Sequence, residues 1–106
     1  MNSEKQTVTF SLLTPPLFYV CGNLEINSKW HHKHMYQKGN WEVIFVLSGV
    51  LYMDIDGSRY IISQDCYFLV PPYKDISGYQ DSPLGTEILW IHFFPKEVVT
   101  MIILQN

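Results

Sequence analysis

Apolar residues recur in short runs separated by turn residues along most of the chain. Leu17 to Cys21, Trp41 to Leu47, Cys66 to Val70 and Thr86 to Phe94 each have the length of a strand, and each is followed by glycine, serine or proline. Runs of this length that end at turn residues are typical of β-strands. Many short strands with regular turn signals predict an all-β sandwich or small barrel.

The clearest hairpin surrounds Asp56-Gly57. This dipeptide supplies the positive φ angles that a two-residue hairpin turn requires. Counting outward from the turn places Asp54 opposite Arg59, which makes a favourable charge pair on the solvent face. The same alternation predicts a buried face made of Leu51, Met53, Tyr60 and Ile62.

The two ends of the chain depart from the strand pattern. Residues 1–16 have a polar start, a stretch from Thr7 to Leu13 that suits a short strand or an arm, and Pro15-Pro16, so we expect an N-terminal arm here. Residues 95–106 predict a short helix, because their opening proline and early glutamate suit a first helical turn. This helix would be apolar on most sides and therefore has to be buried. It could begin a linker in a longer protein, pack in a dimer, or fold back onto its own barrel.

Composition indicates a single folded domain that binds neither DNA nor a membrane by itself. The 106 residues are 47% apolar and 16% charged, unlike the composition of disordered chains. The net charge is −3 and no Lys/Arg cluster occurs, so nothing would attract a phosphate backbone. Ser48, Asp54 and Glu87 interrupt the longest apolar runs, and no run is long enough to span a bilayer.

The cysteines and the N-terminus favour a cytoplasmic protein with reduced thiols. Cys21 and Cys66 are far apart in the sequence, and no charged segment leads into an apolar one at the N-terminus. Each cysteine is expected to be a small buried residue. A single disulfide between them is the alternative.

Polar and aromatic residues on two predicted strands are candidates for a binding site. Trp90 and His92 alternate with apolar neighbours, so an indole and an imidazole share one face of the last strand. Aromatic rings stack on apolar faces of sugars, and His or Tyr can add hydrogen bonds. Glu42 has the strand parity of Ile44; if that face lines a barrel, its carboxylate needs a structural partner or a ligand. Trp90 could instead be a core residue without a ligand.

Three segments read together resemble the N-terminal cupin sensor domain of AraC-family transcription regulators. They are WEVIFVLSG at 41–49, DCYFLVPP at 65–72 and WIHF at 90–93, in the order and spacing of that family. The resemblance covers residues 17–94. It implies a cupin-type double-stranded β-helix, or jelly roll, that senses a small effector, frequently a sugar. In the family, helices join this domain to a C-terminal pair of DNA-binding helix-turn-helix motifs, which are absent from this sequence.

The resemblance also suggests ligand contacts. In the arabinose-responsive member for which the family is named, a tryptophan at the place of Trp90 and a tyrosine near the place of Tyr79 contact the sugar. In the N-terminal arm, Phe10 is the candidate to close over the pocket. The mouth differs from the family pattern, because Tyr73 stands where other members have glycine and no histidine occurs near Asp75.

A metal site is the second interpretation of the polar residues. His32 and His34 project to one face of an extended segment, and with Glu42 they could supply three ligands to a divalent metal. Against this, Glu42 follows His34 by eight residues where the cupin metal motif has four or five, and the histidine of the second motif is missing. His31 and His34 could also be ordinary exposed loop residues, and His32 or His34 could hydrogen-bond an effector.

These observations together predict the effector-sensing and dimerisation domain of an AraC-type regulator rather than an enzyme. We expect an arm at 1–16, a cupin sensor at 17–94 and the start of a linker or dimerisation helix at 95–106. The expected ligand is small and polar, with a carbohydrate as the first candidate, and no cofactor or metal is expected. A homodimer is expected, with DNA bound only through a C-terminal domain. The candidate ligand contacts are Trp90, His92, Tyr79, Glu42, His32, His34 and Phe10.

Two alternatives remain open at the level of sequence. One is a stand-alone metal-dependent cupin enzyme, an isomerase or dioxygenase, that uses His32, His34 and Glu42. The other is a cupin with a filled interior that serves only as an interaction module. One barrel hosts many functions, so fold resemblance alone does not choose among these.

Overall fold

A computed structural model describes residues 5–10, 17–95 and 98–104, and the described residues form ten strands. The strands are β1 (Lys5–Phe10), β2 (Leu17–Glu25), β3 (Met35–Tyr36), β4 (Trp41–Ser48), β5 (Val50–Ile55), β6 (Ser58–Ser63), β7 (Tyr67–Val70), β8 (Asp75–Gly78), β9 (Glu87–Phe94) and β10 (Val98–Leu104). Among the described residues, no helix is long and apolar enough to cross a bilayer.

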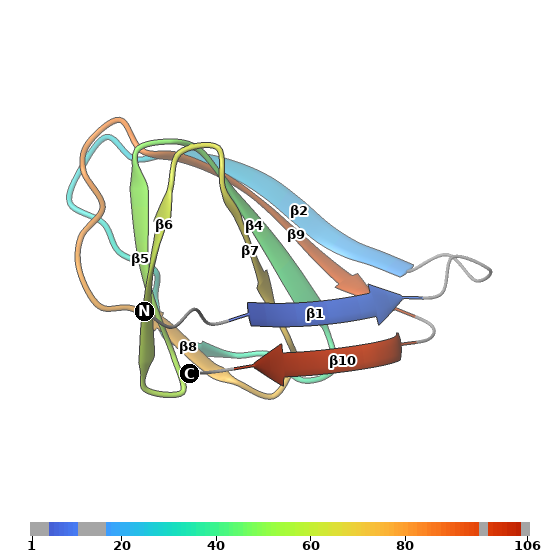
Figure 1. The fold of residues 1–106 in the computed structure, drawn as a ribbon. Helices are drawn as coiled ribbons and strands as arrows, with labels where there is room; N and C mark the ends of the chain where they lie inside the picture. The colour runs from blue at the N-terminus through green and yellow to red at the C-terminus, as the bar shows by residue number, and fades with distance from the viewer. Residues whose placement is uncertain (1–4, 11–16, 96–97, 105–106) are drawn as a thin grey trace.

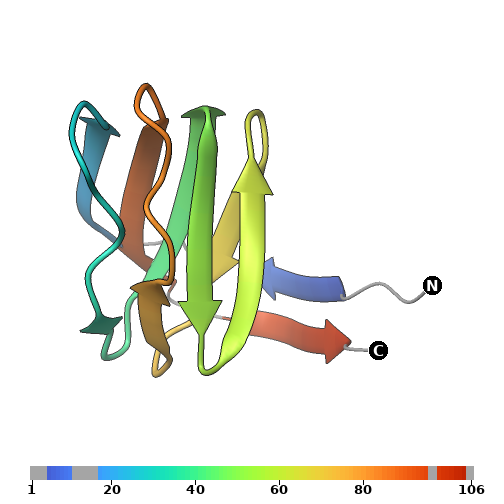
Figure 2. The ribbon, with the colours of Figure 1, turned by 90° about the vertical axis from the view of Figure 1, so that its left-hand side faces the viewer.

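Two four-stranded antiparallel sheets form the body of the domain. One has the strand order β2-β9-β4-β7 and the other β3-β8-β5-β6, while β1 pairs with β10 in a separate two-stranded sheet. Figure 1 shows β2, β9, β4 and β7 side by side, and Figure 2 brings the β5–β6 hairpin of the other sheet to the front. This arrangement confirms the all-β prediction with facing sheets.

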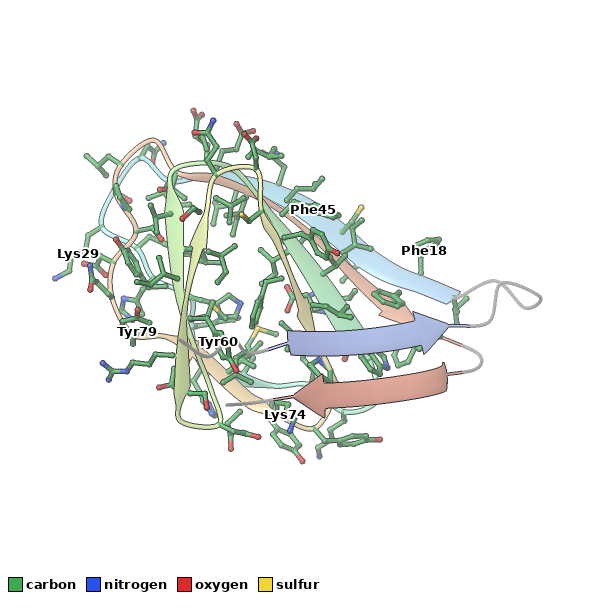
Figure 3. The ribbon with its side chains drawn as sticks, viewed as in Figure 1. Phe18, Lys29, Phe45, Tyr60, Lys74 and Tyr79 are labelled. Atoms are coloured by element: carbon green, nitrogen blue, oxygen red, sulfur yellow. The ribbon has the colours of Figure 1, made fainter. Side chains whose placement is uncertain are left out.

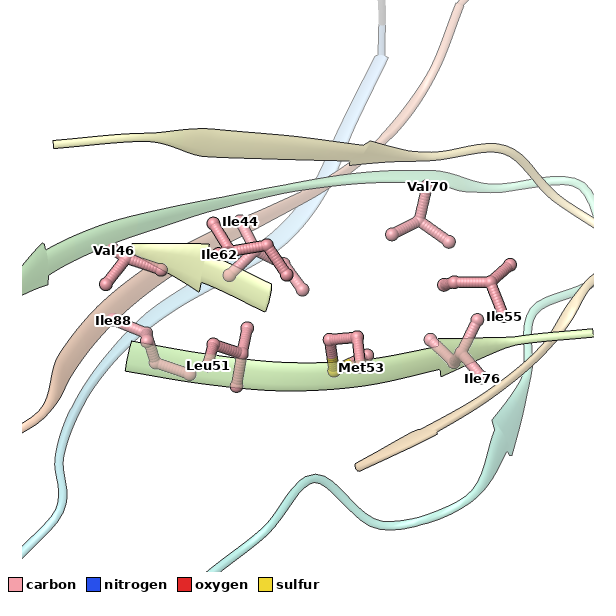
Figure 4. Packing of buried hydrophobic residues seen from close by; sticks show 9 residues of the cluster. All are labelled: Ile44, Val46, Leu51, Met53, Ile55, Ile62, Val70, Ile76 and Ile88. Atoms are coloured by element: carbon pink, nitrogen blue, oxygen red, sulfur yellow. The ribbon is translucent and has the colours of Figure 1, made fainter. Parts of the chain in front are cut away.

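The core lies between the two sheets. Every second residue of β5 is buried, as expected when one face of a strand lies against the opposite sheet. Met53 is fully buried, and Leu51, Ile44 and Val46 are each 1% exposed. Figure 4 shows these side chains meeting between strands of both sheets. The complete cluster comprises Ile44, Val46, Leu51, Met53, Ile55, Ile62, Val70, Ile76 and Ile88.

The hairpin has the register that the sequence predicts. Asp54 lies opposite Arg59, and the Arg59 Nε is 3.6 Å from Asp54 Oδ2 at the solvent-facing side. Asp56 and Gly57 have φ angles of 49° and 90°, so both turn residues adopt the left-handed conformation. The predicted inner face is confirmed, since Leu51, Met53 and Ile62 are buried and Tyr60 packs against them.

The predicted C-terminal helix is wrong for residues 98–104, which form strand β10. Its backbone pairs with β1, and Thr7 lies opposite Ile102. The segment is rich in valine, isoleucine and threonine, whose branched side chains favour strands over helices. The apolar pattern by itself fits either a helix or a strand, and pairing with β1 near the start of the chain favours the strand.

The cysteines also differ from expectation, because Cys21 and Cys66 are both free and exposed. Cys21 lies on β2 next to Gly22, which faces the Trp90 ring between the sheets. Alternation along a strand then directs Cys21 outward. Cys21 thus lies on the outer face of a sheet, whereas the sequence predicted that it would be buried.

Candidate functional site

A cavity of about 340 Å³ opens between the two sheets, a size within the range of small-molecule sites. It has an apolar wall and a few polar groups. The apolar lining consists of Val20, Leu24, Trp30, Met35, Ile44, Ile88 and Trp90. The polar lining consists of His31, His32, Lys33, Glu42 and His92.

The strand register arranges the sheet side of this cavity in three levels. Glu42 on β4 lies opposite His92 on β9, and we call this pair the polar level. The next inward pair is Ile44 and Trp90, which form the middle level. Leu24 on β2 lies opposite Ile88 on β9, and these two residues form the apolar level. Because inward residues alternate with a period of two, each level is one pleat away from the next.

The polar level is a buried hydrogen-bond network. Glu42 is 2% exposed and His92 is 7% exposed. The Gln37 Nε2 donates to Glu42 Oε1 at 2.7 Å, and His92 Nε2 lies 3.2 Å from Glu42 Oε2. The Asn40 Nδ2 lies 3.0 Å from His92 Nδ1. Each carboxylate oxygen therefore has a protein partner, which offsets the cost of burying it.

The partners of His92 indicate its tautomer. The Asn40 Nδ2 can only donate, so the facing His92 Nδ1 accepts, and the proton of a neutral ring is on Nε2, directed at the carboxylate. The partner of Gln37 likewise fixes the orientation of its amide, because only the NH₂ group can donate to the Glu42 carboxylate. Its Oε1 is buried and has no partner among the described residues. Glu42 is thus held in place structurally, and its carboxylate keeps further acceptor capacity on the cavity side.

The middle level depends on a glycine. A Cβ at Gly22 would lie 2.3 Å from Cζ2 of Trp90, so the indole occupies the space that any side chain at position 22 would take. Gly22 and Trp90 are paired on neighbouring strands. The absence of a side chain lets the large ring lie against the sheet and leaves room in front of it.

A loop between β2 and β3 covers another side of the cavity. Its backbone is bonded to the end of β8 and to the segment that leads from β8 into β9. Gly78 N–H donates to the His32 carbonyl at 2.8 Å, and Ser82 N–H donates to the Trp30 carbonyl at 3.0 Å. The His31 Nδ1 lies 2.8 Å from Asp81 Oδ1. These contacts hold Trp30, His31 and His32 over the cavity.

Four of the seven predicted contact residues meet at the cavity: Glu42, Trp90, His92 and His32. Their role in ligand binding stays a prediction. The sequence did not single out Trp30, Lys33, Met35 or Leu24, which also line it. The run of aromatic and basic residues at 30–34 was a usable signal for Trp30 and Lys33.

The other three predicted residues lie elsewhere or are not described. His34 is exposed and its Nε2 bonds Asp75 Oδ1 at 2.9 Å. Tyr79, labelled in Figure 3, does not line the cavity; its ring contacts Tyr52 at 5.7 Å between centroids and lies 4.6 Å from the Arg59 guanidinium. The backbone of Phe10 belongs to β1, and its side chain lies outside the described part.

The polar residues do not fit a metal centre. Within residues 17–95, no group of three or more His, Cys, Asp and Glu side chains could hold a metal ion. His34 pairs with Asp75, while Glu42 is bound to Gln37 and His92. The ligand set of His32, His34 and Glu42 is therefore not assembled.

Solved structures with similar folds are cupins and related proteins. The cupin domain of Schizosaccharomyces pombe Cnp3 has a TM-score of 0.56 and 16% identity, over 87% of this chain and 65% of that one. KdgF from Halomonas sp. has a TM-score of 0.57 and 14% identity, over 89% and 80%. A predicted oxalate decarboxylase from Thermotoga maritima has a TM-score of 0.57 and 15% identity, over 86% and 80%. At these identities, the similarity shows the fold alone.

Sequence comparison identifies the family. No curated protein matches the chain. A family model described as the AraC-like ligand binding domain matches residues 19–103, which include both large sheets, the cavity and most of β10. The match covers well over half of the chain and agrees with the order of motifs and with the cupin-like arrangement of the strands. The chain therefore belongs to the AraC-like ligand-binding domain family.

Proposed function

We propose that this domain senses a small-molecule effector for a transcription regulator and binds it in the cavity between the sheets. The observation that carries the proposal is the convergence of Trp90, Glu42 and His92 on one cavity from two neighbouring strands. A stacking surface beside hydrogen-bonding groups is the combination that carbohydrate recognition uses. A sugar or sugar-like molecule is thus the proposed class of effector.

The proposed role is regulatory and not catalytic. DNA binding would reside in a C-terminal domain, and the regulator would work in the cytoplasm as a homodimer. An effector can change regulation only if it binds one conformation of the protein better than another. The N-terminal arm is the proposed responsive segment, with Phe10 as the residue that closes over the bound effector. Deleting residues 1–14 should therefore change effector affinity, and unchanged affinity would remove the arm from the mechanism.

Titration with a panel of monosaccharides, monitored by calorimetry or NMR, tests the binding function. We expect saturable binding to at least one sugar, and a loss of tenfold or more in affinity for Trp90→Ala. Leu89→Ala is the matched control, because Leu89 neighbours Trp90 on β9 but is not part of the cavity lining. Equal affinity for W90A and L89A would refute the proposed site. Failure of the folded protein to bind any sugar would refute the proposed effector class.

Dimerisation is tested separately by sedimentation or light scattering over a range of protein concentrations. A concentration-dependent shift from one to two copies is the expected result. A single species with the mass of one chain at all concentrations would mean that this domain does not dimerise by itself.

A further inference from the structure

On the sheet side of the cavity, polar and apolar groups are segregated along its length. The ionisable side chains Glu42 and His92 occur at the polar level. The middle level pairs Ile44 with Trp90, and the apolar level has hydrocarbon side chains on both strands. A ligand that extends along the strands would therefore meet acceptors at one end and hydrocarbon at the other.

The polar level suits hydrogen-bond donors. The Glu42 carboxylate receives one bond at each oxygen and can accept more. On the loop side, outside the polar level, His32 adds an acceptor; its ring centroid lies 6.3 Å from that of Trp30. Its Nδ1 lies 2.6 Å from the carbonyl of Lys33, which can only accept, so Nδ1 carries the proton and Nε2 of the neutral ring has a free lone pair. Hydroxyl groups satisfy such acceptors, whereas an anionic group beside Glu42 would be repelled.

The opposite part of the cavity does not suit a polyhydroxylated molecule. Leu24 and Ile88 form the apolar level, and both side chains line the cavity. A sugar hydroxyl placed here would lose its hydrogen bonds to water and gain none from the protein. A hydrocarbon group in the same position would bury apolar surface of the ligand and of the protein.

We infer that the effector is amphipathic: a sugar or sugar-like head bound at the polar level, carrying an aryl or alkyl substituent that lies along Ile44, Leu24 and Ile88. This inference rests on the proposed carbohydrate-binding function and narrows it from free sugars to glycosides with an apolar aglycone. Burial of a phenyl-sized group is worth about ten- to hundredfold in affinity.

Matched pairs of ligands test the inference. Glucose, galactose, xylose and arabinose are each titrated as the free sugar and as the phenyl glycoside, with phenol as a control for the aglycone alone. The expected result is that, for the sugar that binds, the phenyl glycoside binds at least tenfold more tightly than the free sugar. Phenol should bind more weakly than the glycoside.

Two variants locate the substituent. Leu24→Ala should lower the preference for the phenyl glycoside to below about threefold, because Leu24 belongs to the apolar level and its loss should weaken binding of the phenyl glycoside more than binding of the free sugar. Leu89→Ala removes a similar side chain outside the cavity and should leave the preference intact. Folding of both variants is checked by circular dichroism and thermal unfolding.

The outcomes separate this inference from the function on which it rests. Equal affinity for a free sugar and its phenyl glycoside would overturn the amphipathic effector and leave sugar sensing in place. If L24A and L89A change the preference for the phenyl glycoside equally, the assigned position of the substituent beside Leu24 would be overturned. Phenol that binds as tightly as the glycoside would overturn the sugar head. No binding of any ligand to the folded protein would overturn the proposed carbohydrate function itself.

Discussion

Gly22 is predicted to set the position of the Trp90 indole, and Gly22→Ala tests this directly. A Cβ at this position would lie 2.3, 2.6 and 2.8 Å from three carbons of the indole six-membered ring. Atoms in contact need about 3.5 to 4.0 Å between carbon centres, so the ring has to move away from β2. Because the ring lines the cavity, the available direction is into the space that a ligand would occupy.

The magnitude follows from two opposing effects. Overpacking a well-packed site costs about 1 to 3 kcal/mol, and pushing an indole off its rotamer costs about 0.5 to 1.5 kcal/mol. Replacing glycine by alanine restricts the unfolded chain and returns about 0.4 to 1 kcal/mol, since Gly22 is in strand β2 and has no left-handed φ. We therefore expect G22A to lower the free energy of unfolding by about 1 to 2 kcal/mol.

The assay is urea unfolding of a double-mutant cycle. In a Trp90→Ala background the clash is absent, so G22A should be neutral or stabilising there, and the coupling between the two positions should be about 1 to 3 kcal/mol. Cys21→Ala is the control, because Cys21 is the exposed neighbour on the same strand. The reasoning fails if G22A is neutral in the native background, or equally destabilising when Trp90 is absent.

Three further predictions concern other parts of the molecule. Glu42→Leu leaves buried donors unpaired and should lower the free energy of unfolding by about 2 to 5 kcal/mol. Glu42→Gln should lower it by less than about 1 kcal/mol, because the Gln37 amide can reverse and use its unpaired oxygen. Equal unfolding free energies of the two variants in urea would contradict this prediction. Tyr73 has a φ of 63°, so Tyr73→Gly should be more stable than Tyr73→Ala by about 1 kcal/mol in thermal unfolding, and the reverse order would exclude backbone strain. Both Cys21 and Cys66 should react with a thiol reagent in the native protein, and protection of either thiol would contradict its exposure.

Strand alternation explains why the sheet side of the cavity could be predicted from sequence. The parity of Trp90 with His92, and of Glu42 with Ile44, is a local property that pleating converts into a shared face. The hairpin register follows in the same way from one turn dipeptide. Features of this kind need no knowledge of the rest of the fold.

The loop side of the cavity and the C-terminal strand could not be predicted in this way. Trp30 reaches the cavity because backbone groups of its loop bond the segment before β9, and backbone hydrogen bonds depend little on residue type. His34 has the same parity as His32, yet Asp75 binds it outside the cavity. Residues 98–104 form a strand because they meet β1, a partner that no local pattern reveals.

The turn at Tyr73 is connected to the polar level. The Tyr73 N–H donates to the Gln37 carbonyl at 2.8 Å. The Gln37 side chain in turn donates to Glu42. The left-handed backbone at position 73 therefore helps to hold the residue that orients the buried carboxylate, which gives a physical reason for keeping that conformation despite its cost in a non-glycine residue. Glycine at position 73 would retain the N–H and the turn, so the Glu42 network should survive Tyr73→Gly even though the exposed ring is lost.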